Sequence, residues 1–328
     1  MNIRMQSEML EEKYLCEYAC FSKNTKGRKK DEEKCGIRTE FCRDRDRIVH
    51  SKAFRRLKHK TQVFISPDND HYRTRLTHTL EVSQIAKTIA KALRLNVDLT
   101  EAISLGHDLG HTPFGHMGEH ILNNLSKHGF KHYRQSLRVV DVLEKDGRGL
   151  NLTYEVRDGI LNHAGDMTAE TFEGKIIKYA DRFAYLNHDI DDAIRAGIIK
   201  DSDLPKEYIK ILGERHSKRI NTLICDIIST TLENKEVSMS KKTEDAMMGL
   251  RSFMFETVYK KIGKQDKKVE LVIEKMFKYH FENPEKMPQE FVNLLKDYDK
   301  DTVVCDYIAM TDGYILKKFN ELFIPQTW

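Results

Sequence analysis

Apolar residues recur three or four positions apart over long segments of the chain. Between residues 76 and 95, Leu76, Leu80, Ile85, Ile89 and Leu93 fall near one stripe of a helix. This spacing matches the period of an α-helix that buries one face. No segment of any length alternates apolar and polar residues, which is the pattern of a half-buried β-strand. The sequence therefore predicts an all-α fold.

Residues that favour helix ends predict several boundaries. Asp98 followed by Glu101 is an acidic variant of the capping box, and it predicts a helix over residues 101–110. A long helix is expected over residues 174–196, ended by Gly197. Further helical periodicity covers residues 135–145, 205–233, 245–262, 268–280, 288–297 and 303–322.

The chain shows no internal repeat and no low-complexity linker. We expect an N-terminal arm over residues 1–45, a helical core over 46–200 and a helical C-terminal region over 201–328. Nothing near residue 200 has the composition of a flexible tether, so we expect the C-terminal region to pack on the core.

The composition is that of a soluble globular protein. Hydrophobic residues make up 40% of the 328 residues and charged residues 32%. No apolar run reaches the roughly 18 residues that a membrane-spanning helix needs. The N-terminal segment MNIRMQSEMLEEKY lacks the apolar stretch of a secretory signal. We therefore expect a cytoplasmic protein without a membrane segment.

Neither the cysteines nor the net charge indicates a specific partner. The six cysteines are spread along the chain, and the first four are a poor match to zinc-binding spacings, so we expect reduced thiols. The net charge of +4 does not demand a nucleic acid partner. The short basic run KGRKK at residues 26–30 is expected to be a solvated loop.

Residues 107–120, HDLGHTPFGHMGEH, hold four of the chain's fourteen histidines. The adjacent His107 and Asp108 can both reach one ion if the helix turns or ends there, which Gly106 and Gly110 allow. An imidazole nitrogen with a carboxylate oxygen suits Mn, Fe, Zn, Ni or Co better than Ca or Mg alone. Two ligands do not make a tight site, so we expect further ligands from elsewhere in the chain.

His78 and Asp181 are the candidates for these further ligands. Each lies within a segment of helical periodicity, where a buried carboxylate is costly unless it is paired or binds a metal. Taken singly, His78 could be a core histidine and Asp181 could pair with an arginine. The ordered set of His78, His107–Asp108 and Asp181, with spacings of 29 and 73 residues, favours a metal site.

This ordered set resembles that of the HD-domain phosphohydrolases. Three segments also look like those of the bacterial deoxyguanosinetriphosphate triphosphohydrolase-like proteins: RIVHSKAFRRLKHKTQVFISPDNDHYRTRLTHTLEVSQIAKTIAKAL, EAISLGHDLGHTPFGHMGE and KYADRFAYLNHDIDDA. VVCDYIAMTDGY is similar to the C-terminal helix of that group. The resemblance covers residues 38–200 and 300–325. It implies an HD-domain helical core with an additional helical C-terminal region.

The resemblance implies a role for each residue of the site. His78, His107, Asp108 and Asp181 would be the metal ligands. His116, Glu119 and His132 would be catalytic, and Glu119 would orient His116. The i, i+3 spacing of His116 and Glu119 places both on one helix face, and Pro113 is well placed to start that helix. His120 has no matching role and is expected to be an ordinary surface histidine.

The remaining implied residues would bind the substrate. Tyr185 would pack against the sugar, and Asp189 and Gln62 would hydrogen-bond its 3′-hydroxyl. Phosphate contacts would come from His111, Arg75 and Arg182, since the guanidinium fork suits phosphate oxygens. Tyr185 and Asp189 lie four and eight residues after Asp181, so one helix stripe would carry all three.

The implied reaction is hydrolysis of a deoxynucleoside triphosphate at its α-phosphorus, giving the deoxynucleoside and inorganic triphosphate. The metal would polarise an α-phosphoryl oxygen and lower the pKa of a bound water. Mg²⁺ would accompany the triphosphate tail. The resemblance also implies a homo-oligomer in which deoxynucleoside triphosphates can act as activators. It gives no specific support for single-stranded DNA as a partner.

Two other functions remain open from sequence. His132 and His163 lie between the HD pair and Asp181, where extra ligands of a two-metal phosphodiesterase, nuclease or nucleotidase would occur. A nucleotide-sensing protein without catalysis is the other alternative. The chain also departs from the family pattern, since Arg134 replaces a glutamate after His132 and a glycine is missing before Met310.

Overall fold

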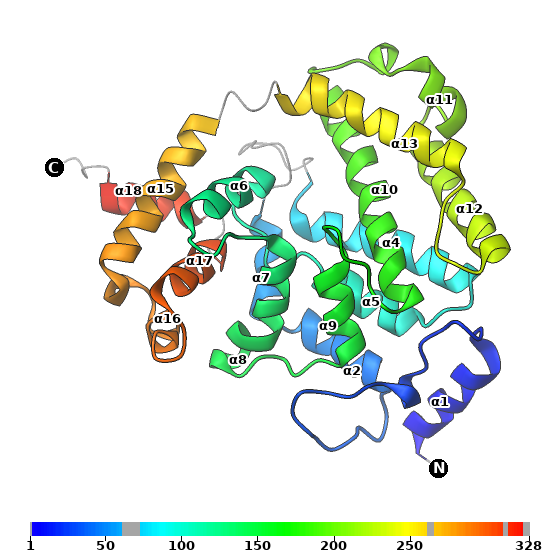
Figure 1. Ribbon diagram of the computed structural model, residues 1–328, viewed down its shortest axis with the longest axis horizontal. Helices are drawn as coiled ribbons and strands as arrows, with labels where there is room; N and C mark the ends of the chain where they lie inside the picture. The colour runs from blue at the N-terminus through cyan, green and yellow to red at the C-terminus, as the bar shows by residue number, and fades with distance from the viewer. Residues whose placement is uncertain (1, 61–72, 261–265, 311–313, 324–328) are drawn as a thin grey trace. The chain divides into compact units, whose positions relative to one another are not determined.

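The computed structural model describes residues 2–60, 73–260, 266–310 and 314–323, and Figure 1 follows their course. The regular structure in these ranges is helical, with no β-strand among them. One isolated antiparallel bridge joins Arg28 and Thr153. The predicted all-α fold is therefore confirmed. None of the helices in the described ranges is long and apolar enough to cross a lipid bilayer.

The chain forms two compact units, each built from three separate segments. Unit 1 comprises Met1–Asp46, His78–Ser104 and Thr153–Lys264. Unit 2 comprises Arg47–Thr77, Leu105–Leu152 and Gln265–Trp328. The three consecutive domains expected from sequence stay a prediction.

Unit 1 is organised around one long central helix, α10 (Phe172–Arg195), which packs against α9 and α12. Its buried side chains include Ile176, Phe183 and Ile190. Gly197 follows the helix with a φ of 68°, so the predicted end at this glycine is confirmed. The other helices wholly or largely in unit 1 are α1 (Ile3–Tyr14), α2 (Glu40–Val49), α4 (Arg75–Ala92), α5 (Val97–Gly106), α9 (Tyr154–Asn162), α11 (Lys206–Leu212), α12 (His216–Asn234) and α13 (Lys241–Met254).

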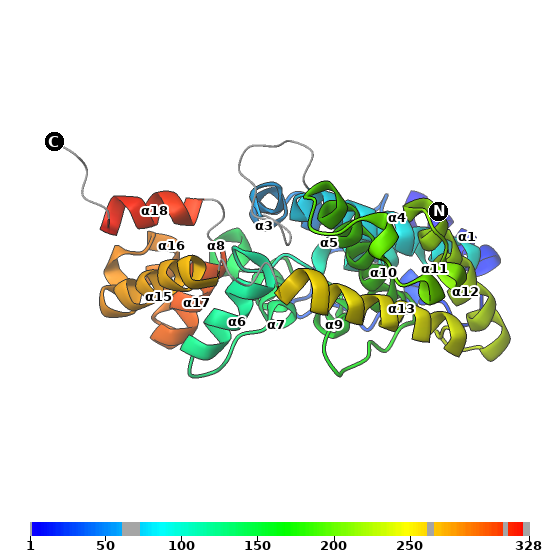
Figure 2. The same cartoon turned by 90° about the horizontal axis from the view of Figure 1, so that it is seen from above.

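Unit 2 is assembled around α15 (Asp266–Glu282), which packs against α6, α17 and α18. Figures 1 and 2 both show α15 to α18 gathered together. The additional C-terminal helices that the sequence predicted are thus present. The other helices of unit 2 are α3 (Lys52–Arg56), α6 (Gly115–Leu125), α7 (His132–Arg138), α8 (Glu144–Gly147), α16 (Gln289–Leu294), α17 (Lys300–Met310) and α18 (Tyr314–Phe323).

The predicted apolar stripe of α4 is correct for Ile85, Ile89 and Leu93, which are buried, and wrong for Leu80, which is 50% exposed. Leu80 lies on the opposite side of the helix from Ile85 and Ile89. His78, in contrast, is buried and shares the face of the buried leucine and isoleucines. The helix therefore directs this histidine into the protein.

The predicted capping box at Asp98 and Glu101 is wrong. Helix α5 begins at Val97, and the Oδ1 atom of Asn96 accepts a hydrogen bond from the Leu99 amide at 3.1 Å. Asn96 is therefore the N-cap, and Asp98 lies in the first turn, where a carboxylate favours the positive end of the helix.

Three predicted C-terminal helices have different boundaries in the structure. Gly213, with a φ of 115°, separates α11 from α12, so residues 205–233 form two helices. The segment predicted as 245–262 begins earlier, at Lys241, and continues after Met254 as a π-helix over Phe255–Tyr259. Helices α17 and α18 replace the single helix predicted over 303–322, and residues 311–313 are outside the described ranges.

The basic run at residues 26–30 is not simply a solvated loop. The side chain of Arg28 is 5% exposed and forms ion pairs with Asp44 and Glu40. Its Nε donates to Glu40 Oε2 at 2.9 Å. Arg28 therefore anchors the N-terminal segment, because a buried charge is retained only where it is paired.

Glu173, in the first turn of α10, ties three segments of unit 1 together. Its Oε1 atom accepts the amide hydrogens of Cys20 at 3.0 Å and Asn96 at 2.9 Å. The carboxyl is fully buried, and burial raises its pKa from 4.5 to about 7, against the lowering effect of these two hydrogen bonds.

This shift predicts how unit 1 responds to pH. Because the folded pKa lies above the unfolded one, the stability contributed by protonated Glu173 is full below pH 4.5 and is lost as the pH rises toward 7. Between these values the wild type should lose about 3 kcal/mol more of its unfolding free energy than Glu173→Gln, whose amide does not titrate. Urea unfolding at a series of pH values measures this difference. If the unfolding free energies of the two proteins changed with pH in parallel, the prediction would be contradicted.

Candidate active site

Within unit 1, His78 of α4 lies against Asp181 of α10. The Nε2 atom of His78 is 3.1 Å from Asp181 Oδ1, and their side chains are 2% and 23% exposed. The ring of His188 meets that of His78 edge to face, with centroids 5.9 Å apart. His188 is also 3.1 Å from Glu81 through its Nε2 atom. Two of the four predicted metal ligands are therefore brought together by one pair of helices.

Within unit 2, the other two predicted ligands follow the end of α5 at Gly106. His107 Nε2 is 3.7 Å from Asp108 Oδ2, and both side chains are at least 96% buried. Arg75, at the start of α4, donates from Nη1 to Asp108 Oδ2 at 2.6 Å. The arginine predicted as a phosphate contact thus also neutralises a predicted metal ligand.

The loop after Asp108 is held by Ser136 of α7. Ser136 Oγ donates to the carbonyl of His107 at 2.6 Å and accepts from the amide of Gly110 at 2.9 Å. A Cβ at Gly110 would lie 2.8 Å from Gln135 Cβ and closer still to the neighbouring main chain. Only glycine therefore permits this approach of the loop to α7.

Three histidine rings gather beyond this loop in unit 2. The ring of His111 stacks on that of His132 with centroids 4.8 Å apart, and His116 lies 5.3 Å from His111. One ligand atom each of His111, His116 and Glu119 lies within 4.8 Å of the others. Helix α6, which carries His116 and Glu119, begins at Gly115, two residues later than Pro113. We call His111, His116, Glu119 and His132 the histidine group.

Glu119 hydrogen-bonds to His132 rather than to His116. Its Oε2 atom is 2.6 Å from His132 Nδ1. Burial alone would raise the pKa of Glu119, but this hydrogen bond and the charge of His132 outweigh burial and lower it. The ionised carboxylate of Glu119 therefore supports His132. It takes the place of the glutamate that the family pattern has at position 134, where this chain has Arg134.

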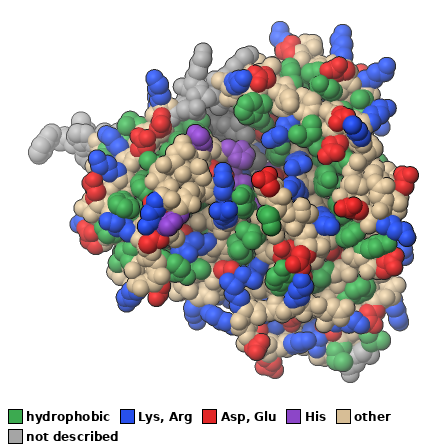
Figure 3. Space-filling view, in the orientation of Figure 1, with side chains coloured by type: hydrophobic (Ala, Val, Ile, Leu, Met, Phe, Trp, Pro, Cys, Tyr) green, Lys and Arg blue, Asp and Glu red, His purple; other side chains and the backbone are tan. Residues whose placement is uncertain are grey.

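Two members of the histidine group are held neutral. Burial lowers the pKa of His111 well below 6.5, and the nearby positive charge of Arg75 lowers it further. Loss of hydration around its ring, and then the charge of Arg75, lower the pKa of His116 to about 4; the residue as a whole is exposed, but its ring faces those of His111 and His132. Histidine side chains reach the molecular surface in Figure 3. Each neutral imidazole offers one donor and one acceptor nitrogen.

Asp189, predicted to hold the 3′-hydroxyl, has a partner that the sequence did not reveal. Tyr259 donates its hydroxyl hydrogen to Asp189 Oδ2. Burial and then the charge of Asp189 raise the pKa of Tyr259 well above 10. Tyr259 lies in the π-helix after α13, 70 residues from Asp189, so no local spacing connects the two.

Tyr185 and Arg182 lie with Asp189 on α10, and both are half-buried. Burial raises the pKa of Tyr185. Gln62 lies outside the described residues. The exposed His120 contacts Asn124 at 3.3 Å, as an ordinary surface histidine would.

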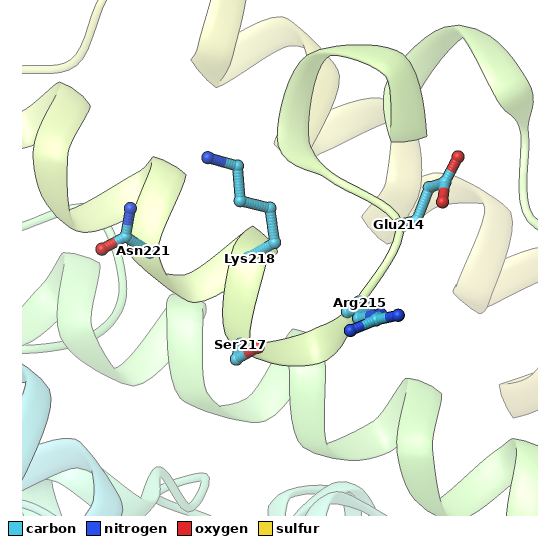
Figure 4. A pocket seen from close by; sticks show the side chains of 5 residues that line it. All are labelled: Glu214, Arg215, Ser217, Lys218 and Asn221. Atoms are coloured by element: carbon cyan, nitrogen blue, oxygen red, sulfur yellow. The ribbon is translucent and has the colours of Figure 1, made fainter.

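One open pocket in unit 1 lies where the chain enters α12 (Figure 4). Its lining comprises Glu214, Arg215, Ser217, Lys218 and Asn221. None of the predicted site residues lines this pocket, so it adds nothing to the site.

Comparison with known proteins agrees with the helical fold. Residues 75–186 match the HD domain family, and residues 237–321 match a phosphohydrolase-associated domain. The first match contains all four predicted metal ligands. The protein is therefore an HD-domain phosphohydrolase.

Relatives of known name cover essentially the whole chain. A deoxyguanosinetriphosphate triphosphohydrolase-like protein of Caldanaerobacter subterraneus is 58% identical over 100% of this chain and 98% of its own length. Proteins of the same name from Clostridium tetani and Clostridium perfringens are each 51% identical over 99% of this chain and 97% and 99% of their own. The chain belongs to the family of deoxyguanosinetriphosphate triphosphohydrolase-like proteins.

The buried Arg75–Asp108 pair yields a stability prediction. Arg75→Met leaves the buried carboxylate without this partner and should lower the unfolding free energy by about 3–5 kcal/mol. Arg134→Met, which removes the same charge from an exposed position of unit 2, should cost less than about 1 kcal/mol. Urea unfolding of both variants in the presence of EDTA makes the comparison. Equal losses of unfolding free energy in the two variants would show that the Arg75–Asp108 pair contributes no more to stability than an exposed arginine does.

Proposed function

We propose that the protein is a metal-dependent triphosphohydrolase that converts a deoxynucleoside triphosphate and water to the deoxynucleoside and inorganic triphosphate. The observation that carries this proposal is the histidine group, in which the buried, neutral imidazole of His111 stacks on the ring of His132 and lies near the positive charge of Arg75. The names of the relatives point to the same substrate class.

We propose His78, His107, Asp108 and Asp181 as the ligands of a divalent metal. Two imidazoles and two carboxylates are a suitable donor set for Mn, Fe, Zn, Ni or Co. The donor atoms of His78 and Asp181 already lie 3.1 Å apart. A bound divalent ion would supply Lewis acidity toward a phosphoryl oxygen, and Mg²⁺ would accompany the triphosphate.

His111 is proposed to contact a phosphate of the substrate. The side chain is 1% exposed, and among the described residues neither ring nitrogen has a hydrogen-bond partner. A buried polar group without a partner costs about 1–3 kcal/mol of stability. A phosphate oxygen that accepts its N–H bond would remove this cost, and Arg75 would contribute positive charge.

His116 is proposed to move the proton in the reaction. Water attacks the α-phosphorus, the bond from phosphorus to the 5′-oxygen breaks, and that oxygen must take up a proton. A neutral His116 can take a proton from the water and return it to the 5′-oxygen. His132 is proposed to face the α-phosphate, with its ring fixed by Glu119.

The sugar would be recognised by residues of α10. We propose that Tyr185 packs against the sugar, that Asp189 accepts from its 3′-hydroxyl and that Arg182 meets a phosphate. Tyr259 would fix the carboxylate of Asp189 through their hydrogen bond. Gln62 remains a predicted second contact to the 3′-hydroxyl. The homo-oligomer and activation by deoxynucleoside triphosphates also remain predictions.

Product analysis tests this function. The protein is incubated with Mn²⁺ or Mg²⁺ and the four deoxynucleoside triphosphates, singly and mixed, and the products are identified by phosphorus NMR. We expect inorganic triphosphate and deoxynucleoside. His116→Ala should lower the rate by about 10²–10⁴-fold, the usual contribution of an acid–base group.

His120→Ala is the matched control, because His120 lies on the same helix but is exposed and contacts the side chain of Asn124. Its rate should stay within about twofold of the wild type, as expected for a surface substitution. Release of pyrophosphate or of a monophosphate would reject the triphosphohydrolase in favour of another phosphohydrolase reaction.

A further inference from the structure

Lys60 is a buried lysine that no part of the proposed reaction uses. It is 2% exposed, whereas the neighbouring Lys58 is exposed. Its Nζ donates to the carbonyl of His111 at 2.6 Å and to the carbonyl of Ala309, near the end of α17, at 3.1 Å. These three residues all belong to unit 2, although 249 positions separate Lys60 from Ala309.

The main chain of Lys60 has a further contact at the site. Its carbonyl accepts the amide hydrogen of Arg75 at 2.9 Å, and Arg75 in turn binds Asp108 through Nη1. The amide of His111 donates to the carbonyl of Asp108 at 3.1 Å. These hydrogen bonds therefore form a closed network, in which Lys60 is linked to Arg75, Arg75 to Asp108, Asp108 to His111, and His111 back to Lys60.

A lysine at this position needs a physical reason. Lysine is almost never fully buried unless it is paired, because the ammonium loses its hydration. Hydrogen bonds from a charged donor are about twice as strong as neutral ones, so an ammonium fixes two carbonyls more firmly than a hydroxyl or an amide would. An apolar side chain would leave both carbonyls without this donor.

We infer that Lys60 is a positioning residue, which holds the His111 loop and the end of α17 in fixed relation to Arg75 and Asp108. It contacts the main chain of the very residue whose ring is proposed to meet the phosphate. Its effect on turnover rests on the proposed function. Its effect on the two main-chain segments does not.

Hydrogen–deuterium exchange tests the structural half of this inference. The full-length Mn²⁺-loaded protein is compared with Lys60→Met, which keeps the length of the side chain and removes the donors. Exchange should accelerate at least about tenfold both in peptides over residues 107–114 and in those over 300–310, because one donor serves both. Peptides over α12, in unit 1, serve as the reference and should be unchanged.

Lys58→Met is the matched control, since it removes the same charge from an exposed position. It should exchange as the wild type does in every peptide. Acceleration in neither segment, in only one of them, or equally throughout unit 2 would overturn the inference. If Lys60→Met does not fold, Lys60→Gln, which retains an amide donor on a shorter side chain, replaces it under the same criteria.

Steady-state kinetics test the catalytic half. A displacement of about 1 Å in a positioning contact can cost about 10²-fold in rate. Lys60→Met should therefore lower kcat by about 10–100-fold with a smaller change in KM, while Lys58→Met leaves both unchanged. An unaltered kcat alongside accelerated exchange would overturn the positioning role. If the wild type hydrolyses no deoxynucleoside triphosphate, the proposed function fails, and the exchange result still decides whether Lys60 holds the two segments.

Discussion

The ion pair between Arg75 and Asp108 is the interaction on which the site in unit 2 depends. Both side chains are at least 94% buried, so neither charge can rely on water. The guanidinium of Arg75 lies 2.6 Å from the carboxylate of Asp108, and the carbonyl of Lys60 holds the amide of Arg75 in place. The carbonyl of Asp108 in turn accepts a hydrogen bond from the amide of His111. This bond helps to fix the position of His111, the first residue of the histidine group. A predicted metal ligand, a proposed phosphate contact and the loop between them are therefore positioned by one buried pair of charges.

Burial, and then the positive charge of Arg75, keep two members of the histidine group neutral. Three imidazoles beside a guanidinium would repel one another if they were protonated, and burial penalises the charged forms further. His111 and His116 therefore remain neutral, and the single carboxylate in the group, Glu119, pairs with His132. The result separates two tasks. In the proposed reaction, Arg75 would supply positive charge for an anionic substrate, and the two neutral rings would supply hydrogen bonds and a place for a proton.

The sequence predicted what depends on local spacing and missed what depends on long-range packing. The helical class follows from periodicity, and the family follows from the motif at residues 107–120. The resemblance implied that Glu119 orients His116, a role that the three-residue spacing allows, yet the hydrogen bond of Glu119 goes to His132, thirteen residues away. Tyr259 hydrogen-bonds to Asp189, 70 residues away, and Lys60 hydrogen-bonds to Ala309, 249 residues away. A single sequence carries no signal for contacts at such separations. Even within one helix, Leu80 was wrongly predicted to lie on the buried face. Periodicity counts every apolar residue toward the buried stripe, including those that remain exposed.

The same constraint on buried charge shapes unit 1, where it serves structure as well as chemistry. Arg28 pairs with Asp44 and Glu40 to fix the N-terminal segment, Glu173 joins that segment to α10, and His78 faces Asp181. Well-packed apolar residues in such places would often give equal or greater stability. A fold that must present imidazoles and carboxylates in its interior cannot use that solution everywhere. Its helices are therefore held together at several points by satisfied polar groups, whose protonation makes the stability of the fold depend on pH.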